Sequence, residues 1–191
     1  YTKANDMDRL INELTYYSSI DNNRIPYNFH RINVAEFFAD CVEDVGLDLE
    51  SKNIQLNYSN LVEPDTRIIA DPEQLKKVIN NIIGNSIKYM DKEKGVIDIR
   101  LLDEVDSIRV EIEDNGKGIA QKDLQKIFER FYRTDASRNS AQGGSGIGLS
   151  IVKKIVEDHG GYVWATAKEG EGTCMHFVLR KYIELQPGGT K

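Results

Sequence analysis

The sequence predicts an α/β sandwich, a sheet that carries helices on one of its faces. Two observations support this fold class. Segments with the 3.6-residue periodicity of amphipathic helices alternate along the chain with segments of strand character. Two of the strand segments, 95–102 and 107–114, are separated by a short polar turn, which is typical of an antiparallel hairpin.

The first segment, residues 6–20, is predicted to be an amphipathic helix that ends before Pro26. Residues of one face recur at steps of three and four, namely Met7, Leu10, Ile11, Leu14, Tyr17 and Ser18. About two heptads of coiled-coil character cannot bury such a stripe alone. Two interpretations remain open: the helix folds back on the domain, or it is the end of a longer dimerising helix.

The remaining elements follow in order after Pro26. Strands are expected at 29–33, 54–58, 67–70, 95–102, 107–114, 162–168 and 173–180. Helices are expected at 34–51, 75–90 and 147–159, with a short one near 123–131. The tail, residues 186–191, is expected to be disordered.

The composition excludes several classes of protein. The 191 residues include 31 acidic and 25 basic ones, a net charge of −6, which argues against a nucleic-acid binder with a concentrated basic face. No apolar run approaches the roughly 18 residues of a membrane span, and no signal peptide opens the chain. Cys41 and Cys174 lie in unlike contexts and are interpreted as reduced packing residues of a cytosolic protein rather than a disulfide.

Two glycine-rich runs carry the first chemical signal. Residues 114–119 (DNGKGI) follow a predicted strand, and residues 143–149 (GGSGIGL) lead into a predicted helix. Glycine lets the backbone approach a ligand closely, and a helix N-terminus attracts anions, so a phosphate chain is the expected guest. Neither run matches the dinucleotide or Walker A pattern. Each run alone fits a simple turn equally well, but both in this order favour a nucleotide site.

The helix at 75–90 carries the second signal. Opposite its apolar stripe, Asn81, Asn85 and Lys88 recur at i, i+4 and i+7. Carboxamide oxygens are hard ligands that suit Mg²⁺, and a lysine one turn on can meet phosphate charge. The alternative is a solvated polar face, although Glu and Lys, rather than two poor helix formers such as Asn, are typical of such a face.

Four segments resemble, in order, the N, G1, F and G2 boxes of sensor histidine kinases: 81–89 (within NNIIGNSIKY), 114–119 (DNGKGI), 128–133 (FERFYR) and 144–149 (GSGIGL). Residues 170–173 resemble the last glycine box, and the resemblance covers about residues 32–179. It implies the Bergerat ATP-binding fold, with a mixed five-stranded sheet and three long helices on one face. It also implies three parts: a remnant of the dimerisation and histidine-phosphotransfer helix (1–25), the ATPase catalytic domain (29–184) and a disordered tail (185–191).

The resemblance implies ATP and Mg²⁺ as cofactors and gives the site residues roles. Asp114 would accept a hydrogen bond from the adenine amino group, with Thr173 helping through water, while Asn85 and Asn81 would hold the metal. Lys88, Tyr89 and Arg133 would approach the phosphates or the sugar. The other nucleotide-binding residues expected from the boxes are Gly116, Gly118, Ile119, Tyr132, Gly144, Ser145, Gly146, Ile147, Gly148 and Leu149. Residues 134–142 would form a mobile lid.

The function implied is transfer of the ATP γ-phosphate to a histidine on a dimerisation domain, for relay to a response regulator. None of His30, His159 and His176 fits the acceptor pattern, so the acceptor is expected upstream of residue 1. The expected partners are the chain's own dimerisation bundle, a response regulator and a second copy of the full-length parent protein. The chain would be a cytoplasmic domain of that parent, which is expected to be anchored to a membrane. Two alternatives remain: an anti-sigma-type serine kinase, which generally lacks the F box, and a nucleotide-binding scaffold without activity.

Overall fold

The computed structural model describes residues 7, 8, 11, 12, 14–16, 18, 19, 27–134 and 145–184. One five-stranded sheet contains, in spatial order, β2 (Ile54–Asn60), β4 (Gly95–Asp103), β5 (Ser107–Asp114), β7 (Gly172–Arg180) and β6 (Tyr162–Lys168). The β2–β4 pair is parallel and the other three pairs are antiparallel, so the sheet is mixed, as predicted. A separate two-stranded antiparallel sheet joins β1 (His30–Asn33) to β3 (Arg67–Ala70).

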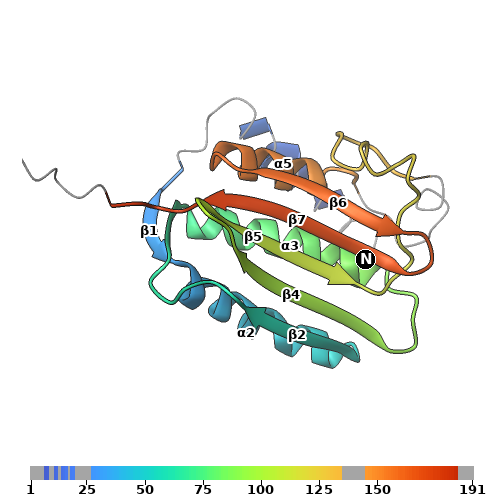
Figure 1. Cartoon of the computed structure of the whole chain (residues 1–191). Coiled ribbons are helices and arrows are strands. Elements are labelled where there is room, and N and C mark those ends of the chain that lie inside the picture. The colour runs from blue at the N-terminus through green and yellow to red at the C-terminus, as the bar shows by residue number, and fades with distance from the viewer. Residues whose placement is uncertain are drawn as a thin grey trace, which may run out of the picture.

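Three helices cover one face of the large sheet and leave the other open (Figure 1). They are α2 (Val34–Ser51), α3 (Pro72–Lys88) and α5 (Gly148–Asp158). Strand residues alternate in direction, and the positions that face the helices are buried and apolar. They include Ile97, Ile99 and Leu101 of β4, Ile108, Val110 and Ile112 of β5, and Phe177 and Leu179 of β7. The predicted α/β sandwich is therefore confirmed.

The start of α3 is fixed by Asp71, which lies just before Pro72. Its carboxylate Oδ1 accepts hydrogen bonds from the backbone N–H groups of Glu73 at 3.0 Å and Gln74 at 3.2 Å. Its other oxygen accepts from the backbone of Asn28 at 2.9 Å. The helix therefore begins three residues before the predicted start at Leu75, because an aspartate cap and a proline in the first turn satisfy the unpaired amides.

The prediction of a short helix near residues 123–131 is wrong. Residues 121–131 form successive turns, with backbone bonds from Lys126 to Asp123 at 2.8 Å and from Glu129 to Lys126 at 2.9 Å. Phe131 then takes a left-handed φ of 59° and donates its N–H to the Gly146 carbonyl at 3.0 Å. A segment this short is only marginally stable as a helix, and the hydrogen bond from Phe131 to Gly146 stabilises a loop conformation instead.

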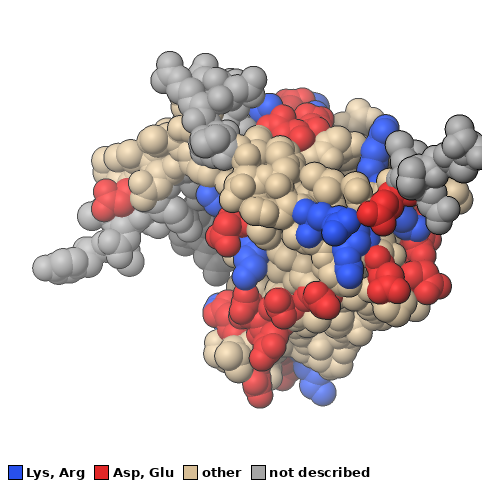
Figure 2. Space-filling view, turned by 90° about the vertical axis from the view of Figure 1, so that its left-hand side faces the viewer, with Lys and Arg blue, Asp and Glu red and all other residues tan. Residues whose placement is uncertain are grey.

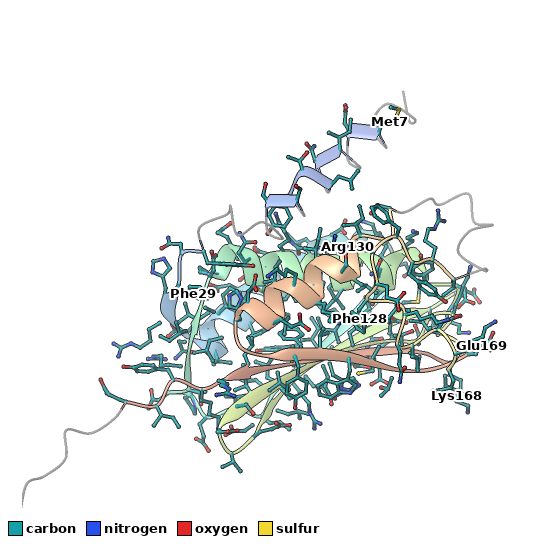
Figure 3. All side chains as sticks on the ribbon, turned by 90° about the horizontal axis from the view of Figure 1, so that it is seen from above. Met7, Phe29, Phe128, Arg130, Lys168 and Glu169 are labelled. Atoms are coloured by element: carbon teal, nitrogen blue, oxygen red, sulfur yellow. The ribbon has the colours of Figure 1, made fainter. Side chains whose placement is uncertain are left out.

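The described residues of the N-terminal segment are helical, and Figure 3 places Met7 beyond the helical layer, away from the sheet. Tyr16 contacts α3: its hydroxyl donates to Gln74, and the Lys77 Nζ lies 3.2 Å from its ring centroid. Met7, Ile11 and Leu14 lie on the opposite side of the helix and remain 63%, 55% and 42% exposed. The segment therefore touches the domain through Tyr16, while Met7, Ile11 and Leu14 of its apolar stripe stay uncovered.

Several expectations concern the cysteines, the surface and segments outside the described residues. Cys41 and Cys174 are buried and unpaired, as predicted. On the face shown in Figure 2, Lys and Arg side chains lie among Asp and Glu rather than forming a continuous basic surface. None of the helices in the described part of the chain combines the length and apolar character needed to cross a bilayer. The expected lid beyond Thr134, Gly144 and the tail 185–191 lie outside the described residues.

Candidate functional site

A cavity of about 300 Å³ lies beside the C-terminal half of α3. Its other walls come from the ends of β5 and β7, from the loop between β5 and α5, and from the start of α5. The volume is within the range of small-molecule sites. Among the described residues, all the predicted nucleotide-binding ones line it except Gly116, whose backbone N–H contacts Asp114, and Ile147, which is buried in the core.

Asp114 is the last residue of β5 and faces the cavity. Ser86 of α3 donates a hydrogen bond to its Oδ2 at 2.8 Å, and the backbone N–H of Gly116 donates to Oδ1 at 3.0 Å. Burial raises the pKa of this carboxyl group above its ordinary value, although the bonds from Ser86 and Gly116 oppose that shift. The result is a desolvated, oriented acceptor that can discriminate among ligands by their N–H donors.

Thr173 lies directly opposite Asp114 in the β5–β7 ladder and lines the same cavity. Met175 of β7 and Ile119 of the loop add apolar wall beside this polar pair. A flat, mostly apolar ring with one exocyclic amine fits such a surface, because the ring needs apolar walls and the amine needs one acceptor. The geometry of this end of the cavity therefore suits adenine.

Two glycines shape the loop between β5 and α5, which lines the cavity. Gly118 has a φ of +70°, and a Cβ there would lie 2.1 Å from the Lys168 carbonyl oxygen. Gly146 has a φ of +71°, and a Cβ there would lie 2.9 Å from the Phe131 backbone. Figure 3 shows that the loop bearing Phe128 and Arg130 lies at the same end of the sheet as Lys168 and Glu169. Only glycine permits both turns, so the close approach of the loop depends on them.

The N-terminus of α5 opens toward the cavity through Ser145, Gly146, Gly148 and Leu149. The Ser145 hydroxyl accepts from the Ile147 N–H at 3.2 Å, but the N-cap residue Ile147 makes no side-chain cap and the first turn carries no acidic residue. The first amides of a helix have no partner within it, and they carry the positive end of its dipole. An anionic group in this cavity therefore finds donors already oriented toward it.

Asn81, Asn85 and Lys88 of α3 all face the cavity. The amide nitrogen of Asn81 donates to the Lys77 carbonyl at 2.8 Å. Its Oδ1 consequently points toward α5, where a Cβ on Gly148 would lie 2.9 Å from it. Carboxamide oxygens at i and i+4 on one helix face provide hard ligands without adding negative charge, which fits a Mg²⁺ ion held mainly by phosphates.

Tyr132 and Arg133 complete the loop side of the cavity. The Tyr132 hydroxyl donates to Asp123 Oδ1 at 2.6 Å, which holds the residue after the turns at 121–131 to a residue near their start. The groups predicted to bind the purine, the phosphates and the metal lie on different elements of the chain, and the fold brings them to one cavity.

Comparison with known proteins identifies this arrangement. The family model described as histidine kinase-, DNA gyrase B-, and HSP90-like ATPase matches residues 70–183. The nucleotide-free catalytic domain of histidine kinase ThkA is 30% identical, with a TM-score of 0.68, over 81% of this chain and 96% of that one. The chain belongs to this ATPase family. Its likeness to ThkA identifies it further as an ATP-binding catalytic domain of the sensor histidine kinase class.

Two further relatives are longer than this chain. Sensor histidine kinase WalK of Bacillus subtilis is 33% identical over 174 residues, which are 91% of this chain but 28% of that protein. ThkA in complex with the response regulator protein TrrA is 27% identical, with a TM-score of 0.76, and covers 94% of this chain and 49% of that one. The catalytic domain therefore spans less than a third of the WalK sequence that it matches.

Ser86 is a polar residue of the histidine kinase site that was not predicted from the sequence. It follows Ile82 and Ile83 at i+4 and i+3, so it shares their buried face, and it is 4% exposed. A hydroxyl at a core position of a helix needs a hydrogen-bond partner, and this requirement could have indicated that Ser86 contacts another buried polar group. The identity of the partner, Asp114, depends on the packing of α3 against β5, which the sequence pattern does not specify.

Proposed function

We propose that this catalytic domain binds Mg²⁺–ATP and transfers the γ-phosphate to a histidine on a dimerisation bundle. The observation that carries the proposal is the convergence on one cavity of the buried Asp114 carboxylate, the Asn81–Asn85 stripe and the amides that begin α5. The three groups suit the purine, the metal and the phosphates of a single ligand. ATP binding itself is the property of the family to which the chain belongs.

Within this proposal each group has one task. Asp114 accepts the adenine amino group, with Thr173 beside it, and the amides of Gly148 and Leu149 receive the phosphates. Asn85 and Asn81 hold the magnesium ion, which offsets phosphate charge when bound. Lys88 and Arg133 add positive charge around the phosphate chain. Phosphoryl transfer depends mainly on such positioning and charge neutralisation, so the domain needs no covalent intermediate.

The absence of a base at position 81 favours transfer to a protein over hydrolysis. A neutral amide does not take up a proton at ordinary pH, and the Asn81 nitrogen is engaged by the Lys77 carbonyl. Two of the chain's three histidines have engaged rings, and the third, the exposed His30, is followed by Arg31 rather than by the acid expected after an acceptor histidine. His159 lies with Nδ1 2.7 Å from the Ile155 carbonyl and accepts the Asp71 N–H at Nε2, while His176 is 9% exposed beneath Trp164. The acceptor is therefore supplied by the bundle.

The proposed partners follow from the N-terminal helix and from the relatives. The uncovered stripe of Met7, Ile11 and Leu14 supports its place in a dimerising bundle of the parent protein. The complex of ThkA with TrrA supports a response regulator as the recipient of the phosphoryl group. We place the domain in the cytoplasm on a membrane-anchored parent, a proposal that rests on the histidine kinase resemblance.

Labelled phosphate tests the reaction. The chain is incubated with Mg²⁺ and γ-labelled ATP, with and without a separately prepared bundle that carries the acceptor histidine. We expect label only on the bundle, and we expect it to be lost in acid and kept in base, as phosphohistidine is. An acid-stable product would support the serine kinase instead. Bound ATP with no labelled product would support the scaffold without activity.

A further inference from the structure

The open face of the sheet, turned toward the viewer in Figure 1, carries a group of side chains that the nucleotide site does not use. Glu111 of β5 lies directly opposite His176 of β7 in the antiparallel ladder. Cys174 lies two residues before His176, so the strand alternation directs it to the same face. Glutamate, thiol and imidazole therefore meet at one point of this face, and their side chains are largely buried there.

The distances between these groups are close to those of a metal site. His176 Nδ1 lies 3.2 Å from Glu111 Oε1 and 4.0 Å from Cys174 Sγ, and the three ligand atoms lie within 4.8 Å of one another. Tetrahedral zinc, with bonds of about 2.0–2.3 Å, separates its ligand atoms by roughly 3.3–3.8 Å. Side-chain shifts of less than about an ångström would thus complete three corners of a tetrahedron.

The ring of His176 is already oriented by its neighbours. Its Nε2 lies 2.8 Å from the Thr166 hydroxyl of β6, which leaves Nδ1 facing Glu111 and Cys174. Trp164 stacks on the ring with centroids 4.8 Å apart and planes 4° apart. Hydrogen bonding to the distal nitrogen of a ligating histidine is the usual way in which proteins fix its orientation toward a metal.

The surrounding charges allow Glu111 to exchange partners. Arg100 Nε lies 2.9 Å from Glu111 and Arg109 Nε 3.5 Å from it, but each arginine also contacts a second carboxylate. Arg100 contacts Glu113 at 2.6 Å and Arg109 contacts Glu104 at 3.4 Å. Both cations therefore keep an ion pair when one Glu111 oxygen turns to another ligand.

We propose that Glu111 Oε1, Cys174 Sγ and His176 Nδ1 form a binding site for a zinc-class cation, with water as the fourth ligand. One thiolate, one imidazole and one carboxylate suit Zn²⁺ or Co²⁺ rather than Mg²⁺. Two negative ligands offset the charge of the ion. On binding, the metal–sulfur bond forms as the Cys174 S–H proton passes to water.

The states of the groups without metal fit this exchange. Burial lowers the pKa of His176, so the ring is neutral near pH 7 and keeps a nitrogen lone pair. Burial also raises the pKa of the Cys174 thiol to about 12, so sulfur becomes a thiolate when the metal displaces its proton.

Cobalt titration of the full chain in excess Mg²⁺ tests the site, because thiolate ligation gives a near-ultraviolet charge-transfer band. Trp164 is the sole tryptophan, so quenching of its fluorescence reports binding beside His176. We expect one equivalent of Co²⁺ to produce both signals and Zn²⁺ to abolish the band. Cys174→Ala should remove the band and weaken binding at least tenfold, and Thr166→Val should weaken it by about tenfold or more.

Cys41→Ala is the matched control, since Cys41 is the other buried thiol, and it should leave both signals unchanged. Urea unfolding of each variant shows whether the sheet is intact, and His176→Asn replaces any variant that is not folded. An unchanged band in Cys174→Ala, or a band lost in Cys41→Ala, would overturn the proposal. Equal Co²⁺ affinity in wild type and Thr166→Val, with both proteins folded, would also count against the orientation described for His176.

Discussion

At the scale of single residues, Asp114 shows how the fold tunes one carboxylate. Burial raises its pKa, and the Ser86 hydroxyl and Gly116 amide oppose the shift by donating to its two oxygens. The strand-end position and the glycines beyond it were predictable, because residue types and spacing show them. Ser86 was not recognised as a partner, because that contact exists only once α3 packs on the sheet.

Nucleotide affinity should fall at acidic pH, because Asp114 becomes protonated. The raised pKa means that this carboxylate gains its proton at a higher pH than an ordinary aspartate, whose value is 3.8. The protonated group is a weaker acceptor for the adenine amino group, so affinity is full above the raised pKa and is lost as the pH falls through it. Calorimetry over a pH series should show this loss of affinity at low pH (the acidic limb of the profile) in the wild type and not in Asp114→Asn. Parallel profiles for the two proteins would contradict the assignment.

Ser86→Ala should move that limb to still higher pH, because the ionised carboxylate loses a donor. One hydrogen bond to a charged group corresponds to about 1.5 kcal/mol, or about tenfold in nucleotide affinity at most. Ser107→Ala is the control: Ser107 is also buried, but it begins β5, at the strand's other end from Asp114. Equal affinities and pH profiles for both variants would show that Ser86 does not act on Asp114.

At the scale of elements, periodic helices and alternating strands were predictable, because burial of one face leaves a pattern in the sequence. The bounds of α2, β3 and β6 match the expected ones. The turns at 121–131 were mistaken for a helix, since their geometry depends on a bond to Gly146 that is distant in sequence. The pairing of β1 with β3 as a separate sheet is likewise a long-range property that local pattern does not reveal.

Asp71 should be the most sensitive cap in the domain. It caps α3 with two hydrogen bonds, accepts a third from Asn28, and donates its own N–H to His159 Nε2 at 3.0 Å. Asp71→Ala should lower the free energy of unfolding by about 2 kcal/mol, and Asp71→Asn by less, because asparagine caps nearly as well. Urea unfolding measures both.

Asn33→Ala provides the comparison, since the Asn33 side chain caps α2 through one bond accepted from the Glu36 N–H and makes one other bond, to the Pro64 carbonyl, so its loss should cost about 1 kcal/mol. If Asp71→Ala and Asn33→Ala destabilised the protein equally, the additional contacts of Asp71 would contribute nothing.

At the scale of the whole molecule, two histidines, the buried His176 and the half-buried His159, should make the free energy of unfolding depend on pH. Burial lowers the pKa of both His159 and His176 below the ordinary 6.5. Near pH 6.5 these two histidines therefore become protonated in the unfolded chain but stay neutral in the folded chain. Stability is full above that pH and declines as the pH falls toward the lowered values.

Urea unfolding between about pH 8 and pH 5 should show this decline, and His159→Gln should make it shallower. Glu111, whose pKa is lowered, also contributes to stability. That contribution is lost only at more acidic pH, as the pH falls below the ordinary carboxyl value of 4.5. A slope unchanged by His159→Gln would contradict the contribution of that histidine.

The proposed site requires one ligand to bind across three elements of the fold. Titration of the chain with a non-hydrolysable ATP analogue, with and without Mg²⁺, tests that claim most directly. We predict magnesium-dependent binding that weakens at least tenfold in Asp114→Ala and is unchanged in Asp98→Ala, whose carboxylate accepts from Asn57 at 2.8 Å and lies outside the cavity lining. Binding that is absent in Mg²⁺, or equal in the two variants, would contradict the account.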